Sequence, residues 1–265
     1  MKAISQLDVP KKVRTYDSGQ KRQKGNFIKS IVRDELIPNF GQLTQFEEFF
    51  TYMNSSEYHK DSLHYFRYLN TCGEIISYFQ EIKNLNIIET GAASPITIFL
   101  SDNNSCYKTE SDLRINIDAE SNFADLIFSF EVLEHIKDIP EESFNEVVLF
   151  QGSGAKQYAK ELTRVIKPGG FLVLTSPNPN SYQVISNTIN EKPPYVYRPH
   201  VREYTRAEVL ELFADLELVS HKTLFNFFML SARARHQMNE LFDKMSWSKE
   251  NRGDDHFFVF RKPLD

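Results

Sequence analysis

The 265-residue chain is poor in several residue types that define whole classes of protein. Its two cysteines, Cys72 and Cys106, provide neither a disulfide framework nor a zinc-ligand pair, so a reducing, cytoplasmic setting is expected. Only 10 glycines and 11 prolines exclude a collagen-like or low-complexity chain. No apolar run has the length of a membrane span or a secretory signal. The 22 Phe and 12 Tyr instead indicate a globular chain with an aromatic-rich core.

The net charge of -5 conceals an asymmetry along the chain. Residues 1–33 contain nine basic and two acidic side chains, a local charge of +7, so the remainder carries -12. Because this acidic bulk repels phosphates, no nucleic-acid partner is expected. Residues 1–24 show no apolar periodicity and are interpreted as a basic flexible arm. The arm is either simply solvated or a mobile cap that meets an anionic acceptor.

Two further regions follow the arm. In residues 25–83 the apolar spacing is helical, as at Phe46, Phe49, Phe50 and Met53, and predicts a helical N-terminal cap. From residue 84 to residue 265 short apolar strands alternate with helices, and a helical insert is expected at about 231–246. This alternation predicts one α/β domain with an open, mostly parallel sheet.

The predicted sheet has seven strands, and its last two are joined without a crossover helix, which indicates an antiparallel edge strand. A helix at 158–166 is expected to end at the turn formed by residues 167–170, Lys-Pro-Gly-Gly. The strands are predicted at residues 86–90, 107–110, 114–118, 125–130, 171–175, 216–221 and 256–261.

Ligands of such sheets bind beyond the carboxyl ends of the strands, so the residues that follow each strand are candidates for a site. Gly91 follows the first predicted strand and precedes two alanines, which lets the backbone approach a ligand closely, although an ordinary strand-to-helix connection has the same pattern. Glu110 lies 19 residues after Gly91, a distance suited to an acid that accepts both ribose hydroxyls. The alternative for Glu110 is a solvated glutamate at a strand end.

Residues 130–138, Phe-Glu-Val-Leu-Glu-His-Ile-Lys-Asp, follow the fourth predicted strand. With Glu89, Gly91, Glu110, Asp118 and the 167–170 turn, they make residues 84–228 and the last strand resemble a class I S-adenosylmethionine-dependent methyltransferase. This resemblance implies a Rossmann-like fold and the cofactor S-adenosyl-L-methionine (SAM). The family's E-x-G-x-G-x-G loop maps onto Glu89, Gly91, Ala93 and Pro95, so two of its three glycines are replaced.

The resemblance also implies a set of cofactor-binding residues. Asp118 corresponds to the acid on the adenine side, and Glu110 corresponds to the ribose acid. Asp112 is an alternative ribose acid, because Glu110 and Asp118 are only eight positions apart. The expected cofactor-binding residues are Glu89, Gly91, Ala92, Ala93, Glu110, Asp112, Asp118, Ala119, Phe130 and Glu131.

A narrower likeness concerns segments 109–114, 151–154, 178–182 and 198–205, which are similar to bacterial methyltransferases associated with surface-polysaccharide biosynthesis. It implies a small polar acceptor, such as a sugar or a phosphoryl-linked or nucleotide-linked group destined for a glycan. The candidate acceptor-binding residues are Arg198, Arg202, Tyr204, Asn180 and Tyr182.

A hydroxyl acceptor must lose a proton, and a histidine suits that step near neutral pH. His135 and His200 both lie where strand ends should converge and are the catalytic candidates. His135 could instead cap or pack at a helix start, and His200 could be an ordinary loop histidine. No metal is expected, because residues 131–135 lack the first histidine of the inverted zinc motif.

Two other functions remain open at this stage. Because Ala93 and Pro95 replace family glycines, the chain could be a methyltransferase-like binding module without catalysis. The chain could also be an RNA methyltransferase that binds its substrate through the basic residues of segment 1–33, although the sequence contains no recognisable nucleic-acid-binding module.

Overall fold

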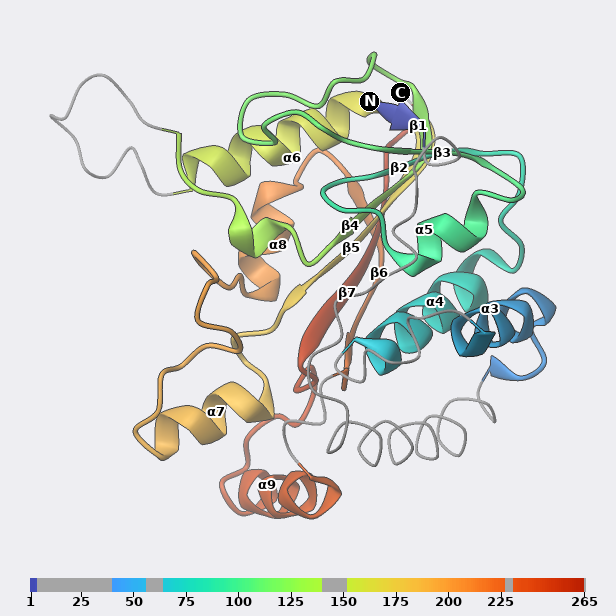
Figure 1. Cartoon of the computed structure of the whole chain (residues 1–265). Coiled ribbons are helices and arrows are strands. Elements are labelled where there is room, and N and C mark those ends of the chain that lie inside the picture. Colours follow the sequence, from blue (N-terminus) through green and yellow to red (C-terminus); the bar gives the residue numbers. More distant parts are fainter. Residues whose placement is uncertain (4–39, 56–63, 140–151, 227–230, 265) are drawn as a thin grey trace, which may run out of the picture. The chain divides into compact units, whose positions relative to one another are not determined.

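The computed structural model describes residues 1–3, 40–55, 64–139, 152–226 and 231–264 (Figure 1). Most of the predicted basic arm, and Gln151 of the polysaccharide-enzyme likeness, lie outside these described residues. The chain divides into two compact units. The first contains Met1, Asn86–Ala92 and Tyr107–Asp265, and the second contains Lys2–Leu85 and Ala93–Cys106.

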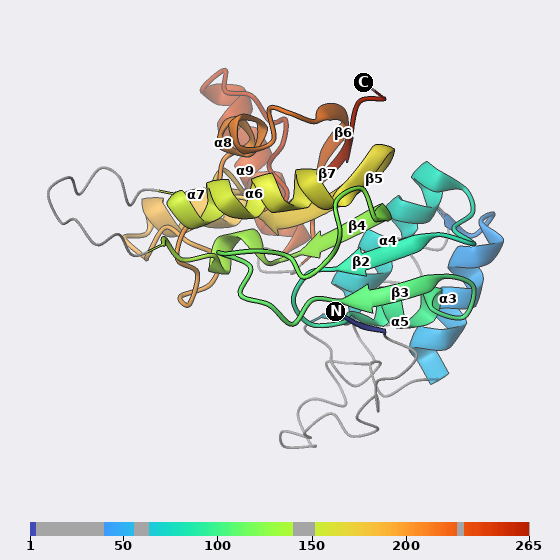
Figure 2. The same ribbon diagram turned by 90° about the horizontal axis from the view of Figure 1, so that it is seen from above.

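The sheet is mixed and mostly parallel, and its strand order is β1-β3-β2-β4-β5-β7-β6. Strand β1 (Lys2–Ala3) has only two residues, so six longer strands make up the body of the sheet. Figure 2 shows β2, β4 and β5 side by side. The six strands are β2 (Asn86–Glu89), β3 (Ser105–Lys108), β4 (Ala124–Phe130), β5 (Ile166–Pro177), β6 (Glu217–Leu224) and β7 (Asp255–Arg261).

Strand directions confirm the expected Rossmann-like arrangement. Strand β4 pairs in parallel with both β2 and β5, so the carboxyl ends of these three strands lie at one edge of the sheet. Strand β7 runs antiparallel to β5 on one side and to β6 on the other. The antiparallel strand is therefore β7, inserted next to the outermost strand β6.

The strand predicted at 114–118 is wrong, and the sheet instead contains the two-residue strand β1 beside its six longer strands. Residues 111–118 form a turn that closes on itself through polar side chains. Ser111 Oγ donates to the carbonyl of Asn116 at 2.8 Å, and the Asp112 carboxylate accepts the Arg114 backbone N–H at 3.0 Å. Such local side-chain-to-backbone bonds compete with strand pairing.

The turn predicted at 167–170 is also wrong. Helix α6 (Ser153–Val165) gives way directly to β5, which includes the Lys-Pro-Gly-Gly segment. The φ angle of Gly169 is +76°, a conformation that glycine adopts without steric cost, and its N–H donates to the carbonyl of Lys262 at 2.8 Å. The glycine therefore allows an irregularity inside a strand, where the sequence suggested the end of a helix.

One face of the sheet is covered by α6 and α8 (Arg206–Leu212), as Figure 1 shows. Their apolar side chains share one buried core with alternate residues of β4, β5 and β7. Burial of such side chains is the main stabilising contribution to the fold. The helix side of this core includes Leu162, Val165, Val209 and Phe213, and the sheet side includes Ile127, Leu172, Leu174 and Phe258.

The first unit also contains the single-turn helix η3 (Leu133–His135), α7 (Tyr182–Ile189) and α9 (Ala232–Lys244). Tyr182 joins α7 to α9, because its ring contacts Phe242 at a centroid distance of 5.2 Å and its hydroxyl donates to Asn239. Among the described helices, none is long and apolar enough to cross a membrane.

The second unit contains α3 (Thr44–Ser55), α4 (Tyr65–Phe79) and α5 (Pro95–Leu100). The predicted helical periodicity is confirmed in α3, which buries Phe46, Phe49 and Met53. Phe49 contacts Phe99 of α5 at a centroid distance of 5.3 Å. Aromatic contacts therefore hold this helical unit together.

Candidate active site

The turn after β2 is shaped by a glycine. Gly91 has a φ angle of +82°, which disfavours any other residue there, and its N–H donates to Thr109 Oγ1 at 3.1 Å. The Thr109 N–H in turn donates to the carbonyl of Glu89 at 3.2 Å. Glu89 itself is only 1% exposed at the end of the strand. The turn is thus fixed by β2 and the residues after β3, with Ala92 exposed at its tip.

The three candidate acids after β3 lie in different surroundings. Glu110 is exposed, and one carboxylate oxygen lies 3.4 Å from Lys108 Nζ. Asp112 is engaged by Arg114, whose guanidinium donates to it at 2.6 Å and lowers the pKa of the carboxyl to about 2. Because Asp112 is committed to its own turn, Glu110 is the more available of the two carboxylates for a ligand hydroxyl.

Asp118 lies beside a depression of about 510 Å³. Partial burial alone would raise the pKa of Asp118, but the hydrogen bond and positive charge of the Met1 amino group outweigh it and lower the pKa. Ser111 Oγ also donates to this carboxylate at 3.3 Å. The depression is lined by Met1, Asn116, Ile117, Asp118, Ala119, Glu120, Phe123 and Arg164.

The chain turns sharply after β4. Phe130 is half-buried and stacks on Phe128 at a centroid distance of 4.9 Å. Glu131 has a φ angle of +53°, and its N–H donates to the carbonyl of Thr175 in β5 at 3.1 Å. This turn starts η3, whose last two residues are Glu134 and His135.

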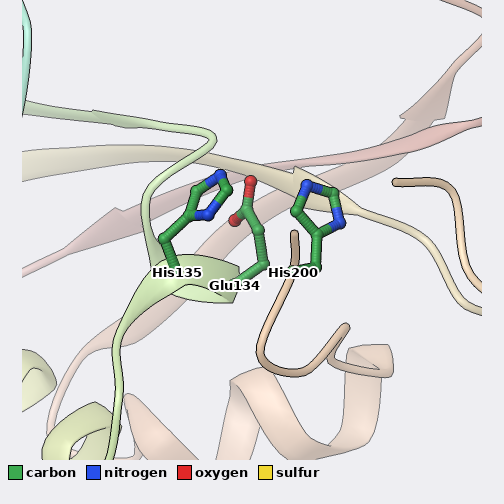
Figure 3. A group of neighbouring side chains, drawn as sticks. All are labelled: Glu134, His135 and His200. Carbon is green, nitrogen blue, oxygen red and sulfur yellow. The ribbon is translucent and has the colours of Figure 1, made fainter. Parts of the chain in front are cut away.

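Glu134, His135 and His200 form what we call the histidine cluster. One ligand atom from each side chain lies within 4.8 Å of the other two. Figure 3 shows the Glu134 carboxylate between the two imidazole rings, and the ring centroids are 4.9 Å apart at an angle of 79°. The loop that carries His200 is fixed to η3, because the Val201 N–H donates to the Glu134 carbonyl at 2.8 Å. The structure therefore brings the two predicted histidines together.

A buried carboxylate orients His200. Its Nδ1 lies 2.8 Å from Glu203 Oε1, and the Glu203 side chain is only 5% exposed. The same oxygen accepts the Val196 N–H at 2.7 Å, which fixes the carboxylate. An ionised carboxylate only accepts hydrogen bonds, so this contact with Glu203 favours the proton on Nδ1 and leaves Nε2 to face the cluster. Glu203 thus sets both the tautomer and the orientation of His200.

Burial lowers the pKa of His135, and the positive charge that His200 can carry lowers it further. His135 is accordingly neutral at neutral pH, the form that accepts a proton or binds a cation. The ring is nevertheless exposed, whereas Glu134 beside it is fully buried. The cluster therefore has one side open to solvent and one side formed by a carboxylate in the core.

Polar side chains underlie the histidine cluster. Ser176 of β5 donates to Glu134 Oε2 at 3.4 Å. At the carboxyl ends of β2 and β4, the buried Tyr158 hydroxyl is 2.5 Å from Thr90 Oγ1 and 2.9 Å from Ser129 Oγ. Burial raises the pKa of Tyr158, so the phenol remains protonated and serves as a hydrogen-bonding group.

The five predicted acceptor-binding residues separate into two groups. Arg198, Arg202 and Tyr204 belong to the loop of His200; Arg202 lies over the Tyr204 ring at 5.3 Å and donates to Glu208. Burial raises the pKa of Tyr204. The other two residues make contacts elsewhere: the Asn180 carbonyl accepts a hydrogen bond from Arg252 at 3.0 Å, and Tyr182 contacts α9.

Sequence reasoning missed Glu134 and Glu203. Glu134 directly precedes His135, but its significance depends on His200, which lies 66 positions after Glu134 in the chain. Glu203 lies three residues after His200, a spacing that could have indicated an orienting carboxylate. The distinctive burial of both carboxylates appears only in the folded chain.

Residues 83–260, about two thirds of the chain, match the family model of the methyltransferase domain. No curated protein sequence is detectably similar to the chain. A SAM-dependent methyltransferase from Thermotoga maritima is 14% identical, with a TM-score of 0.50, over 81% of this chain and 99% of its own. The N-methyltransferase NodS from Bradyrhizobium japonicum, in complex with S-adenosyl-L-homocysteine, is 13% identical, with a TM-score of 0.45, over 83% of this chain and 98% of its own.

At these identities the likeness to solved structures concerns the fold alone. The family match shows that the chain belongs to the methyltransferase domain family and is a class I enzyme that uses SAM.

Proposed function

We propose that the enzyme transfers the SAM methyl group to a hydroxyl of a small polar acceptor, and that the histidine cluster receives this hydroxyl. The observation that carries the proposal is the pairing of His200 with Glu203 beside His135, directly after the turn that ends β4. A neutral imidazole oriented by a carboxylate is suited to accept a hydroxyl proton. The buried carboxylate of Glu134 forms the side of the cluster that faces the core.

The cofactor would bind along the carboxyl ends of β2, β3 and β4. Gly91 to Ala93 would lie against its amino-acid part and Glu110 would accept the ribose hydroxyls. Asp118 and Ala119 line a depression suited to a flat base, while Phe130 and Glu131 follow the neighbouring strand. The exposed Glu110 and the positive φ of Gly91 support this fit. Two of the three glycines of the family loop are replaced in this chain. The glycine that remains is Gly91, whose φ angle is positive.

The reaction makes few demands on the protein. SAM supplies an activated methyl group when bound. The acceptor oxygen forms a bond to the methyl carbon, the bond between that carbon and sulfur breaks, and sulfur keeps its electron pair. His200 Nε2 would take the hydroxyl proton, with His135 positioning the acceptor. The residues around the cluster must therefore align the acceptor and exclude water.

The acceptor class is proposed as a sugar or a phosphoryl-linked group used in bacterial surface glycan biosynthesis. Arg198 and Arg202 give the His200 loop two guanidinium groups, which suit an anionic or hydroxyl-rich acceptor. Both side chains are exposed. The likeness of segments 178–182 and 198–205 to polysaccharide-associated methyltransferases points to the same class. Asn180 and Tyr182 would contribute to the acceptor site if α7 borders it.

The test is a mass shift of 14 Da per methyl group on a panel of nucleotide-activated sugars incubated with enzyme and SAM, a shift set by the atoms exchanged. In His135→Ala and His200→Ala, turnover should fall about 100-fold while calorimetric affinity for S-adenosyl-L-homocysteine survives. His236→Ala is the matched control, since the His236 side chain is 73% exposed. Near-wild-type turnover in both cluster variants would refute the proposed proton transfer. Methylation of RNA, with no methylation of sugars, would refute the proposed acceptor class and identify RNA as the acceptor.

A further inference from the structure

We propose that the histidine cluster is a binding site for one divalent transition-metal ion, of the kind that Zn²⁺ represents, held by Glu134, His135 and His200. The role of the ion in catalysis rests on the proposed function, but its binding does not. Among the residues that the structure describes, this is the group of three whose ligand atoms converge closely enough to hold a metal. Residues 131–135 alone lack the first histidine of the inverted zinc motif, whereas the third ligand of this cluster, His200, comes from a distant part of the chain.

The three ligand atoms lie close to, but slightly beyond, the spacing that a single ion requires. Bonds of about 2.0–2.2 Å from zinc to nitrogen or carboxylate oxygen place two ligands of one ion at most about 4.4 Å apart. The three ligand atoms of the cluster lie within 4.8 Å of one another. In the view of Figure 3 the carboxylate lies between the two imidazoles, and side-chain rotations would have to bring the three ligand atoms onto one ion. Two imidazole nitrogens and one carboxylate oxygen form a donor set that zinc and neighbouring transition metals bind well.

Glu203 supports the same assignment from outside the ligand set. Metal-bound histidines commonly donate their other ring N–H to a carboxylate, which fixes the tautomer and increases the basicity of the ligand. His200 makes this contact through Nδ1, at 2.8 Å from Glu203 Oε1, and so presents Nε2 to the cluster. The Val196 N–H holds the same carboxylate oxygen at 2.7 Å. His200 is thus preorganised as a ligand.

Burial and charge also favour a cation. The Glu134 side chain is fully buried, and a carboxylate in the core is stabilised by a charge of opposite sign close to it. The exposed ring of His135 forms the opposite, open side of the cluster. Three protein ligands and an accessible side are typical of catalytic metal sites, in which water or substrate completes the coordination.

In the ion-loaded enzyme His135 and His200 would be ligands, and the cation would take over the activation of the acceptor. A bound cation lowers the pKa of a coordinated hydroxyl. The acceptor would release its proton to solvent, and its oxygen would then form the new bond to carbon while the carbon–sulfur bond breaks. The overall exchange of atoms and charge is the same as in metal-free transfer.

The experiment is calorimetric titration of ZnCl₂ into the full chain after EDTA treatment and desalting. We expect one ion per chain in the wild-type protein. Affinity should fall about 100-fold or more in His135→Ala and in His200→Ala, and about 10- to 100-fold in Glu203→Gln, which alters only the support of a ligand. His236→Ala, which removes an exposed histidine elsewhere, should bind like wild type. MgCl₂ should give little heat, since Mg²⁺ prefers oxygen ligands.

The outcomes separate the metal site from the proposed function. The metal site is refuted if the wild-type chain binds no zinc, or if both cluster variants bind it as wild type does, which would indicate adventitious binding. Titration of S-adenosyl-L-homocysteine into each variant reports folding independently of zinc. Zinc binding without methylation of any sugar would support the metal site and refute the proposed acceptor class. Unchanged methylation after EDTA, with no zinc binding, would support the proposed function and refute the metal.

Discussion

At the scale of single residues, Tyr158 shows how polar groups are accommodated beneath the active site. Its hydroxyl bonds to Thr90 and Ser129 at 2.5 and 2.9 Å, and the ring is fully buried. Tyr158→Phe would leave two buried hydroxyls without their shared partner, so unfolding free energy should fall by about 1–2 kcal/mol. Chemical denaturation measures this change. The exposed Tyr197→Phe is the control, with an expected effect within about 0.5 kcal/mol; equal effects would contradict the prediction.

The residue scale also shows how far a sequence can define a site. Gly91, Glu110 and His135 could be identified as candidates because each follows a predicted strand, and His200 because its loop leads toward the next strand. The pairing of His200 with Glu203 could not, since it depends on the conformation of an irregular loop. For the same reason, the engagement of Asp112 by Arg114, which distinguishes it from Glu110, required the folded turn. The binding roles of these residues remain predictions.

At the scale of elements, the start of α8 bears directly on the active site. Thr205 and Glu208 form a reciprocal cap: the Glu208 N–H donates to Thr205 Oγ1 at 3.3 Å, and the Thr205 N–H donates to Glu208 Oε2 at 2.8 Å. This cap ends the loop that carries His200 and Glu203. Its loss in Thr205→Ala should lower the unfolding free energy by about 1 kcal/mol. It should also lower turnover several-fold by loosening the loop.

Ser231 provides a matched control for this prediction. Its side chain caps α9 by accepting the Ala234 N–H at 3.2 Å. Ser231→Ala should therefore cost a similar amount of stability, about 1 kcal/mol, but leave turnover unchanged. Denaturation and steady-state kinetics of the two variants make the comparison. If both variants have the same turnover, the cap of α8 is structural only and does not position the His200 loop.

Element prediction succeeded where hydrophobic periodicity was strong and failed where local polar bonds decided the conformation. Strand β4 agrees with the predicted strand to within one residue at either end. Residues 114–118 have alternating apolar side chains but form a turn, because Ser111 and Asp112 bond to the backbone nearby. The Lys-Pro-Gly-Gly segment has the composition of a turn but lies within β5, where Gly169 supplies a positive φ.

At the scale of the whole molecule, the alternation of strands and helices was enough to predict the mostly parallel sheet, and the family match agrees with it. The position of β7 between β5 and β6 was not predictable from spacing, because it depends on pairings between segments far apart in sequence. The domain boundaries at residues 24 and 83 and the cytoplasmic location remain predictions. The acidic residues of the chain include Glu89 at the end of β2 and Glu110 shortly after β3, whereas Asp118 lies in the turn that replaces a predicted strand.

The pairing of β6 with β7 has a consequence for the acid stability of the whole molecule. His221 Nε2 lies 3.1 Å from His256 Nδ1, and His256 is 1% exposed. Burial lowers the pKa of His221 to about 4, with a further contribution from the charge of Arg206. Burial likewise lowers the pKa of His256 to about 3, and the charges of His221 and Arg206 add to the effect. Both imidazoles are therefore neutral in the folded protein at pH values where the unfolded chain already binds protons.

The sign of the pH dependence follows from this difference. Above about pH 6.5 both states are neutral at these positions, and the pair contributes no pH dependence. As the pH falls from about 6.5 toward 4, only the unfolded state gains protons, so stability should fall by up to about 1.4 kcal/mol per pH unit for each histidine. His256→Gln should reduce this slope by the contribution of one histidine, up to about 1.4 kcal/mol per pH unit. His236→Gln, at an exposed histidine, should not change the slope. Urea denaturation between pH 7 and 4.5, a window chosen to span the histidine titration, measures the slopes. Equal slopes in wild type and His256→Gln would mean that His256 is protonated as readily in the folded sheet as in the unfolded chain.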